Sequence, residues 1–254
     1  MTVDLARRGI RAVLLDIEGT TTPIAFVHEE LFGFARARLH EYLLAHQGSA
    51  ALSDVEQRLR MEHAADLARG ETPPPWTEPA SSALEAYARW LMARDRKSPG
   101  LKLLQGQIWE EGYQSGVLRG QVFEDVPRAI RRWHDAGVTI AIYSSGSELA
   151  QRRLFESTEQ GDLTPCLTAF FDTAVGAKIA SDSYGRIAQA LGLTPAEILF
   201  VSDVVSELDA ARAAGLPVVL SIRPGNPPPI LRSSKETTGK ISEEVLVIKH
   251  SSLE

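Results

Sequence analysis

Short apolar runs alternate with helical patterns through much of this chain. The apolar runs have strand character and end at polar or turn-forming residues. Between the later runs, apolar residues recur at the spacing of a helix. Strands are predicted over 12–15, 138–143, 170–171, 198–202 and 217–220. Continuous apolar strands are typical of a parallel sheet that helices cover on both faces. The pattern therefore predicts an α/β fold built on a parallel sheet.

One long helical segment interrupts this alternation after the first strand. From residue 23 to about residue 114, apolar residues recur at helical spacing. Ser53 and Ser82 each stand three positions before a glutamate, a pattern that predicts helix starts at these serines. A helical domain is thus inserted between the first and second strands.

The predicted domains follow from this insertion. Residues 1–22 and 120–225 form the core that contains the sheet, and residues 23–119 form the inserted helical domain. Residues 226–254 form a polar C-terminal tail, with a strand predicted at 245–248. The cluster of Gly and Pro at 225–229 marks the boundary between core and tail.

Composition and charge exclude several classes of protein. The chain has 254 residues, of which 44% are hydrophobic and 24% charged, and no apolar run approaches the ~18 residues that span a bilayer. A net charge of −6 is unfavourable for binding nucleic acid, which relies on Lys and Arg at the phosphates. We expect neither a membrane nor a nucleic acid as partner. We also expect a monomer.

The single cysteine, Cys166, bears on the compartment. One cysteine cannot form an internal disulfide, and its sequence neighbours are not ligands for a thiolate metal site. The N-terminal residues lack the apolar region and cleavage site of a signal peptide. We therefore expect a cytoplasmic protein.

Two carboxylates follow the first predicted strand directly. Asp16 and Glu18 are one residue apart, and Gly19 then frees the backbone to turn. Side chains alternate along a strand, so these two should point the same way, and like charges so close need a cation or a shared proton. Mg²⁺ is the expected cation. The alternative is a solvated turn, because Asp and Gly are common turn residues.

Other polar groups stand at the ends of later strands or before a helix. They are Ser144 with Ser145, Lys178 and Asp203. In an open parallel sheet such segments meet in the crevice at the carboxyl ends of the strands. Asp203 can hold Mg²⁺ together with Asp16, Lys178 supplies a positive charge, and the Ser144 hydroxyl with N–H groups near Ser145 can hold further oxygens.

These groups together describe a site for phosphoryl transfer, in which positioning and cations stabilise the charge on the phosphoryl oxygens. Asp16 is placed to attack phosphorus and form an aspartyl-phosphate that water later hydrolyses. Glu18 is placed to protonate the leaving oxygen and then to activate that water.

Each group also has a purely structural interpretation. Ser144, Ser145 and Asp203 could cap helices, and Lys178 could be an exposed surface residue. The order of the groups and their positions after strands favour catalysis. Glu207, one helical turn after Asp203, could be a further carboxylate near the site or a first-turn residue favoured by the helix dipole, and we favour the latter.

Four strings carry a family resemblance: LLDIEGTTTPIAFV, YSSGS, GAKIASDSYGRIA and FVSDVVSELDAARAAG. They resemble those of the enolase-phosphatases of methionine salvage, within the haloacid dehalogenase-like superfamily, and the resemblance extends from Ala12 to Gly225. The superfamily pattern has Asp two residues after the nucleophile, whereas this chain has Glu18, as that family does. The resemblance implies a Rossmann-like phosphatase core, an inserted helical cap and one Mg²⁺ per site.

The resemblance also implies a substrate and a set of site residues. The substrate would be 2,3-diketo-5-methylthiopentyl-1-phosphate, which is enolised and then dephosphorylated to the acireductone 1,2-dihydroxy-3-keto-5-methylthiopentene. Carried over residue by residue, the resemblance makes Asp16, Glu18 and Asp203 the metal ligands. By the same comparison the substrate is bound by Ser144, Ser145 and Lys178.

Three other functions remain open from the sequence. A phosphatase of the same superfamily acting on another small phosphate ester would share every motif and differ in the inserted domain. A phospho-accepting receiver module of signalling proteins also uses Asp, a hydroxyl residue, Lys and Mg²⁺, but its phospho-accepting Asp is not followed by a long helical insertion. A dehalogenase would not need the metal that Asp203 is expected to hold.

Overall fold

The computed structural model describes residues 5, 8–227 and 246–249, the last of these by their backbone alone. The chain divides into two compact units, one of Met1–Val27 with Arg119–Glu254 and the other of His28–Leu118. The boundaries expected from the sequence lie at 22/23 and 119/120. We call the first the sheet unit and the second the helical unit.

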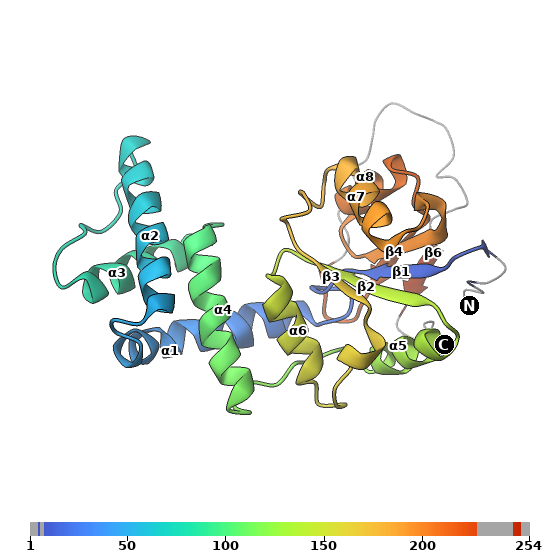
Figure 1. Ribbon diagram of the computed structural model, residues 1–254, viewed down its shortest axis with the longest axis horizontal. Helices are drawn as coiled ribbons and strands as arrows, with labels where there is room; N and C mark the ends of the chain where they lie inside the picture. The colour runs from blue at the N-terminus through green and yellow to red at the C-terminus, as the bar shows by residue number, and fades with distance from the viewer. Residues whose placement is uncertain (1–4, 6–7, 228–245, 250–254) are drawn as a thin grey trace. The chain divides into compact units, whose positions relative to one another are not determined.

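The sheet unit is built on six parallel strands in the order β3-β2-β1-β4-β5-β6 (Figure 1). The strands are β1 (Ala12–Leu15), β2 (Thr139–Tyr143), β3 (Ala169–Phe171), β4 (Ile198–Ser202), β5 (Val218–Ile222) and β6 (Leu246–Lys249). All residues of β1 and β4 are buried, as continuous apolar runs require in a sheet that is covered on both faces. The predicted parallel α/β fold is confirmed.

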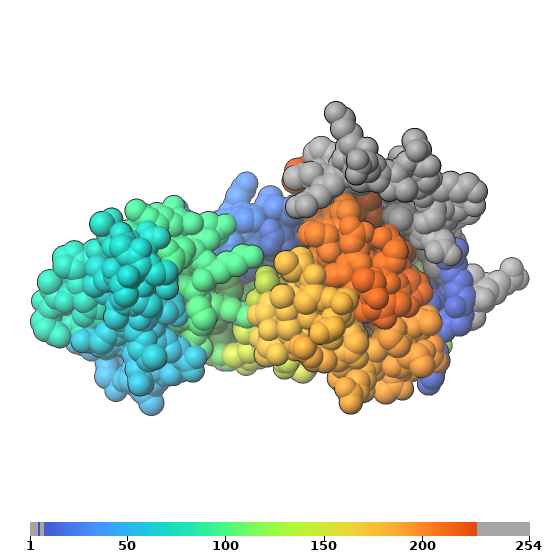
Figure 2. Space-filling model, turned by 90° about the horizontal axis from the view of Figure 1, so that it is seen from above, coloured from blue at the N-terminus to red at the C-terminus, as the bar shows by residue number. Residues whose placement is uncertain are grey.

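Helices cover both faces of this sheet. Figure 1 shows α7 and α8 on one face and α5 and α6 on the other, and Figure 2 shows the segments of α7 and α8 side by side on the surface. The helical elements are α5 (Asp125–Asp135), α6 (Glu148–Glu156), η3 (Thr164–Cys166), α7 (Ser181–Leu191), η4 (Pro195–Glu197) and α8 (Val205–Ala213). Gly192 ends α7 with a φ of 66°, which confirms the predicted end of that helix.

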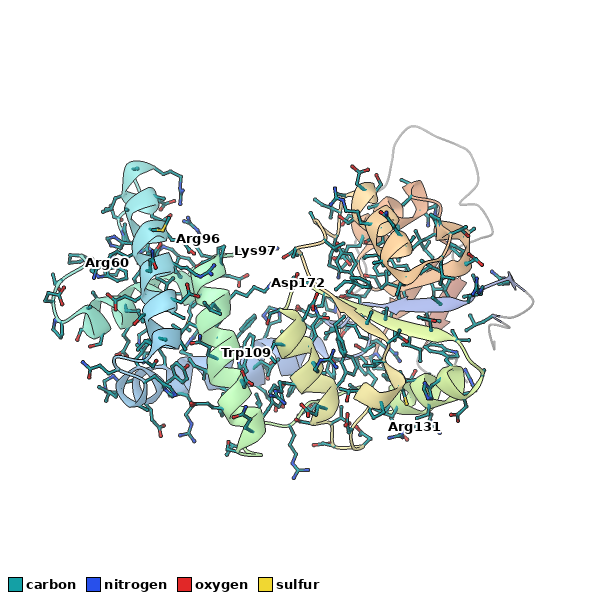
Figure 3. The ribbon with its side chains drawn as sticks, in the orientation of Figure 1. Arg60, Arg96, Lys97, Trp109, Arg131 and Asp172 are labelled. Carbon is teal, nitrogen blue, oxygen red and sulfur yellow. The ribbon has the colours of Figure 1, made fainter. Side chains whose placement is uncertain are left out.

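The helical unit contains the long insertion after β1. Its elements are the π-helical turn η2 (Phe26–Leu31), which begins in the sheet unit, and α1 (Phe32–Ala45), α2 (Ala50–Ala68), α3 (Ala80–Met92) and α4 (Pro99–Gln114). Trp109 on α4, labelled in Figure 3, donates from Nε1 to the Leu31 carbonyl oxygen at 2.7 Å and so joins α4 to η2. None of the helices that the structure describes is long and apolar enough to cross a membrane.

The predicted helix starts at Ser53 and Ser82 are wrong. Ser49 is the N-cap of α2, because its Oγ accepts from the Leu52 N–H at 3.1 Å, and α3 begins at Ala80. Ser53 lies inside α2 and donates its hydroxyl to the Ser49 carbonyl oxygen. A hydroxyl that bonds back into its own helix produces the same sequence pattern as a cap.

The predicted C-terminal strand is present, with a shift of one residue. β6 pairs in parallel with β5, so this part of the chain joins the edge of the sheet. Most of the expected tail, 228–245 and 250–254, lies outside the described residues.

Two glycines of the sheet unit give a matched test of its packing. A Cβ on Gly120 would lie 2.1 Å from the Leu154 carbonyl oxygen, whereas a Cβ on Gly185 in α7 would meet no described atom within 4 Å. We expect Gly120→Ala to lower the free energy of unfolding by roughly 1–3 kcal/mol, because the backbone must shift. We expect Gly185→Ala to raise it by about 0.5–1 kcal/mol, because a helical glycine costs conformational entropy. Urea unfolding measures both changes, and equal changes in the two variants are incompatible with this packing.

Candidate active site

The strand order places the ends of β1 and β4 side by side. Leu15 pairs with Val201, and the Asp16 N–H donates to the Val201 carbonyl oxygen at 3.0 Å. The chain order reverses between these two strands, because β1 is flanked by β2 on one side and β4 on the other. Ligands of open α/β sheets bind in the crevice at such a point. Asp16 and Asp203 leave the sheet there.

A buried ion network links three of the chemistry-bearing residues. Lys178 Nζ lies 2.6 Å from Asp16 Oδ1 and 2.6 Å from Glu207 Oε2. The Ser202 hydroxyl lies 3.3 Å from Asp16 Oδ2 and 3.0 Å from Glu207 Oε2, so it can donate to either carboxylate. The Lys178 side chain is 10% exposed, which contradicts its interpretation as a surface lysine.

Two tyrosines of the sheet unit hold the segment that carries Lys178. Tyr184 on α7 donates its hydroxyl to the Lys178 carbonyl oxygen at 2.7 Å, and Tyr143 at the end of β2 donates to that of Gly176 at 2.9 Å. Gly176 has a φ of 138°, a conformation that favours glycine. The Lys178 ammonium also lies 5.8 Å from the centre of the Tyr143 ring. The backbone before α7 is therefore fixed at Gly176 and at Lys178 by hydrogen bonds from these tyrosines.

The network shifts the pKa values of its members. Burial alone would lower the pKa of Lys178, but the carboxylates of Asp16 and Glu207 raise it above its ordinary value. Burial, and next the charge of Asp16, raise the pKa of Glu207, although Lys178 opposes this. Lys178 is consequently charged at neutral pH and can stabilise an anion beside Asp16.

Asp203 lies next to this network with one oxygen unsatisfied. Its Oδ1 is buried and has no hydrogen-bond partner among the described residues. Burial and the charge of Asp16 raise the pKa of Asp203 to about 7. The N-cap of α8 is Val204, and the Ser202 hydroxyl accepts from the Val204 N–H at 3.1 Å, so Asp203 does not cap this helix. The helix-cap interpretation of Asp203 is wrong.

Ser144 and Ser145 form the turn after β2. Ser144 is 8% exposed and accepts from the Gly146 N–H at 3.4 Å, whereas Ser145 is exposed. The N-cap of α6 is Ser147, whose Oγ accepts from the Ala150 N–H. Neither Ser144 nor Ser145 is therefore a helix cap. Among the hydrogen bonds of the described residues, none joins this turn to the ion network. The structure therefore brings Lys178 into contact with Asp16 and Glu207, but it does not bring Ser144 or Ser145 into contact with them.

Glu18 lies in the tight loop that follows Asp16. It is half-buried and forms a parallel backbone bridge with Thr22. Gly19 has a φ of 74°, and a Cβ there would lie 2.1 Å from Asp203 Oδ2. Only glycine allows the loop to pass so close to Asp203.

The donors at this edge fit a magnesium ion. Mg²⁺ binds through one or two carboxylates and keeps several waters. Asp16 and Asp203 supply two carboxylates, and the buried, unsatisfied Oδ1 of Asp203 is an oxygen that a cation would satisfy. Within the described ranges no group of three or more His, Cys, Asp or Glu is arranged to hold a metal, so no third side chain of these types stands beside the two carboxylates as a ligand.

Several residues of this edge were missed or misjudged from the sequence. Glu207 does lie in the first turn of α8, but its side chain pairs with Lys178, so the alternative that we did not favour, a further carboxylate near the site, is the one that the structure supports. Its spacing of four residues from Asp203 was the available signal. Thr20, Arg223 and Asn226 also make contacts at the loop after β1, and no local pattern marks them.

This chain is similar to known proteins over most of its length. The family model for haloacid dehalogenase-like hydrolases matches residues 10–215. Enolase-phosphatase E1 of Synechococcus elongatus is 50% identical over 222 residues, which cover 85% of this chain and 90% of that protein. A protein of Vitis vinifera named as a bifunctional methylthioribulose-1-phosphate dehydratase/enolase-phosphatase E1 is 47% identical over 226 residues, covering 86% of this chain and 44% of that protein.

Solved structures show the same architecture. The UTR4 protein of Saccharomyces cerevisiae matches with a TM-score of 0.73 at 31% identity, over 94% of this chain and 97% of that chain. The family model and this shared fold define the class of protein as a haloacid dehalogenase-like hydrolase. The chain belongs to that family and, within it, to the enolase-phosphatases E1.

The pKa of Asp203 predicts how stability depends on pH in chelator-treated protein. Its pKa is about 7 when folded against an ordinary 3.8, so the folded state holds an extra proton between these values. The free energy of unfolding therefore falls as pH rises through this window, and the raised pKa of Glu207 acts in the same direction.

Urea unfolding with chelator at about pH 5 and about pH 8 measures this dependence. Asp203→Asn removes the buried charge, so it is expected to flatten the pH dependence and to be more stable than the parent at the higher pH. A variant with the same pH dependence as the parent means that Asp203 does not carry the effect.

Proposed function

We propose that this chain is an enolase-phosphatase that converts 2,3-diketo-5-methylthiopentyl-1-phosphate into the acireductone 1,2-dihydroxy-3-keto-5-methylthiopentene and phosphate, in methionine salvage. The observation that carries the phosphatase half is the burial of Asp16 against Lys178 at the switch point of the sheet. The enolase half is supported by the names of relatives at about half identity.

The name of the Vitis vinifera relative supports the choice of substrate. It couples an enolase-phosphatase to a dehydratase of methylthioribulose-1-phosphate. Loss of water from that sugar phosphate leaves a diketone that keeps the phosphate ester and the methylthio group. The proposed substrate is this product, and its phosphate ester lies next to a carbonyl group that permits enolisation.

Asp16 is the proposed nucleophile. Its carboxylate attacks phosphorus, so that a bond forms between phosphorus and a carboxylate oxygen while the ester P–O bond breaks. Glu18 gives a proton to the leaving oxygen and then takes one from the water that hydrolyses the aspartyl-phosphate. The products are the acireductone, which carries the released hydroxyl group, inorganic phosphate and the free Asp16 carboxylate.

The substrate phosphate is held by groups around Asp16. Lys178 places its charge 2.6 Å from Asp16 Oδ1, where the entering phosphoryl oxygens gather. In our proposal the Ser144 hydroxyl and the N–H groups of the turn at Ser145 hold the remaining oxygens. Glu207 keeps the Lys178 ammonium in place from its other side.

The proposed cofactor is one Mg²⁺ held by the carboxylates of Asp16 and Asp203, with Glu18 contributing as a further ligand through its backbone oxygen. When bound, the ion supplies positive charge to phosphoryl oxygens and to the oxygen of a developing enolate. The unsatisfied Asp203 oxygen supports this assignment. The enzyme is further proposed to act as a cytoplasmic monomer on this small phosphorylated substrate, without nucleic acid or membrane.

Turnover of the diketone phosphate tests the proposal. Incubation with Mg²⁺ should produce the ultraviolet absorbance of an enol together with inorganic phosphate. Asp16→Asn should abolish phosphate release, because an amide oxygen lacks the negative charge that makes a carboxylate nucleophilic. The matched control is Asp209→Asn, on the exposed side of α8, which should keep the parent rate. Phosphate release without any enol signal would reassign the chain to another phosphate ester.

The role of Glu18 has its own test. Glu18→Gln removes the acid–base group, whose contribution is usually roughly a hundredfold to ten-thousandfold in rate. The loss should be smaller for an aryl phosphate than for an alkyl phosphate, because a good leaving group needs no proton. Equal losses on the two substrates, with much weaker Mg²⁺ binding, would show that Glu18 is chiefly a metal ligand.

A further inference from the structure

The loop that carries Glu18 satisfies most of its backbone groups internally. The N–H groups of Thr20, Thr21 and Thr22 all donate to the Ile17 carbonyl oxygen at 2.9 to 3.1 Å. The Gly19 N–H donates to the Thr22 carbonyl oxygen at 2.8 Å. The carbonyl oxygens of Gly19 and Thr20 point out of the loop and need donors from elsewhere in the chain.

Both donors come from the four residues that follow β5. Asn226 donates from Nδ2 to the Gly19 carbonyl oxygen at 2.8 Å, and Arg223 donates from Nε to that of Thr20 at 3.0 Å. These contacts join positions more than two hundred residues apart. The segment 223–226 therefore clamps the loop from the far side of β4.

Arg223 is itself anchored firmly. Its Nη1 lies 2.8 Å from both carboxylate oxygens of Asp125 at the start of α5, and its guanidinium lies 4.6 Å from the centre of the Phe123 ring. The Phe123 N–H donates to the Thr21 carbonyl oxygen at 2.9 Å. Arg223 is 5% exposed, so its contacts with the loop are shielded from water.

The clamp also reaches Asp203. The Thr20 hydroxyl accepts from the Asp203 N–H at 3.0 Å. Thr20 therefore binds Arg223 through its carbonyl oxygen and the Asp203 backbone through its side chain. A Cβ on Gly19 would lie 3.0 Å from Asn226 Nδ2 and 2.1 Å from Asp203 Oδ2, so Asn226 and Asp203 flank the same backbone atom.

We propose that Asn226 and Arg223 are positioning residues for phosphoryl transfer, which hold the Glu18 loop in register with Asp16 and Asp203. The inference rests on the proposed phosphatase reaction and adds the residues that set its geometry. Neither side chain needs to touch the substrate. Displacement of an acid–base group by about 1 Å can cost up to a hundredfold in rate, so a clamp on the loop has a measurable kinetic effect.

The test is a double-mutant cycle between Asn226 and Glu18, measured on ethyl phosphate as a simple alkyl monophosphate. Asn226→Ala should lower kcat about tenfold with KM and melting temperature nearly unchanged. In the Glu18→Gln background the same substitution should lower kcat less than about twofold, because it acts through a group already removed. Equal losses in both backgrounds, or no loss in kcat, would overturn the inference.

Two further variants serve as a control and as a second test. Arg131→Ala on α5 (Figure 3) also removes a side-chain donor to a backbone carbonyl, that of Gln160, and should leave kcat unchanged. Arg223→Lys keeps a charge opposite Asp125 but lacks Nε, so the folded variant should repeat the kinetic pattern of Asn226→Ala, a lower kcat with KM nearly unchanged, whatever its melting temperature. If the unsubstituted protein hydrolyses ethyl phosphate but not the diketone phosphate, the proposed substrate is wrong. The double-mutant cycle on ethyl phosphate can still be measured and still tests this inference.

Discussion

The candidate site depends on one buried ammonium group that faces two carboxylates. Lys178 lies 2.6 Å from both Asp16 and Glu207, and all three side chains are almost removed from solvent. Removing one partner from a buried ion pair typically costs about 3–5 kcal/mol, so each of these groups requires the others. One positive charge between two carboxylates leaves negative charge in excess, and Asp203 adds to it. A divalent cation would balance that excess, so that an anionic phosphate ester could approach Asp16.

The fold makes this network possible because parallel strands deliver distant residues to one edge. β1 and β4 bring Asp16 and Asp203 together, and tyrosines at the end of β2 and on α7 hold the segment of Lys178. The segment after β5 then returns across the edge to the loop after β1. Contacts of side chains with backbone carbonyl groups, rather than side chains facing the substrate, thus set much of the geometry of the site.

The sequence was informative where one local pattern has one structural meaning. β4 was predicted with both ends correct, because a buried parallel strand is a continuous apolar run. Ser53 and Ser82 misled, because a hydroxyl three residues before a glutamate also occurs inside helices. Asn226 looked like the start of a tail, because its neighbours are turn-forming residues. Its partner Gly19 is 207 positions away, a separation that no local pattern reports.

Trapping the phosphorylated protein tests most directly whether Asp16 accepts the phosphoryl group. The protein is quenched with acid during turnover and reduced with borohydride, which converts an acyl phosphate into an alcohol, and the peptides are then weighed by mass spectrometry. We expect reduction at Asp16 that depends on the presence of substrate. Reduction that depends on substrate at a different carboxylate, or turnover with no reduction at all, would contradict it.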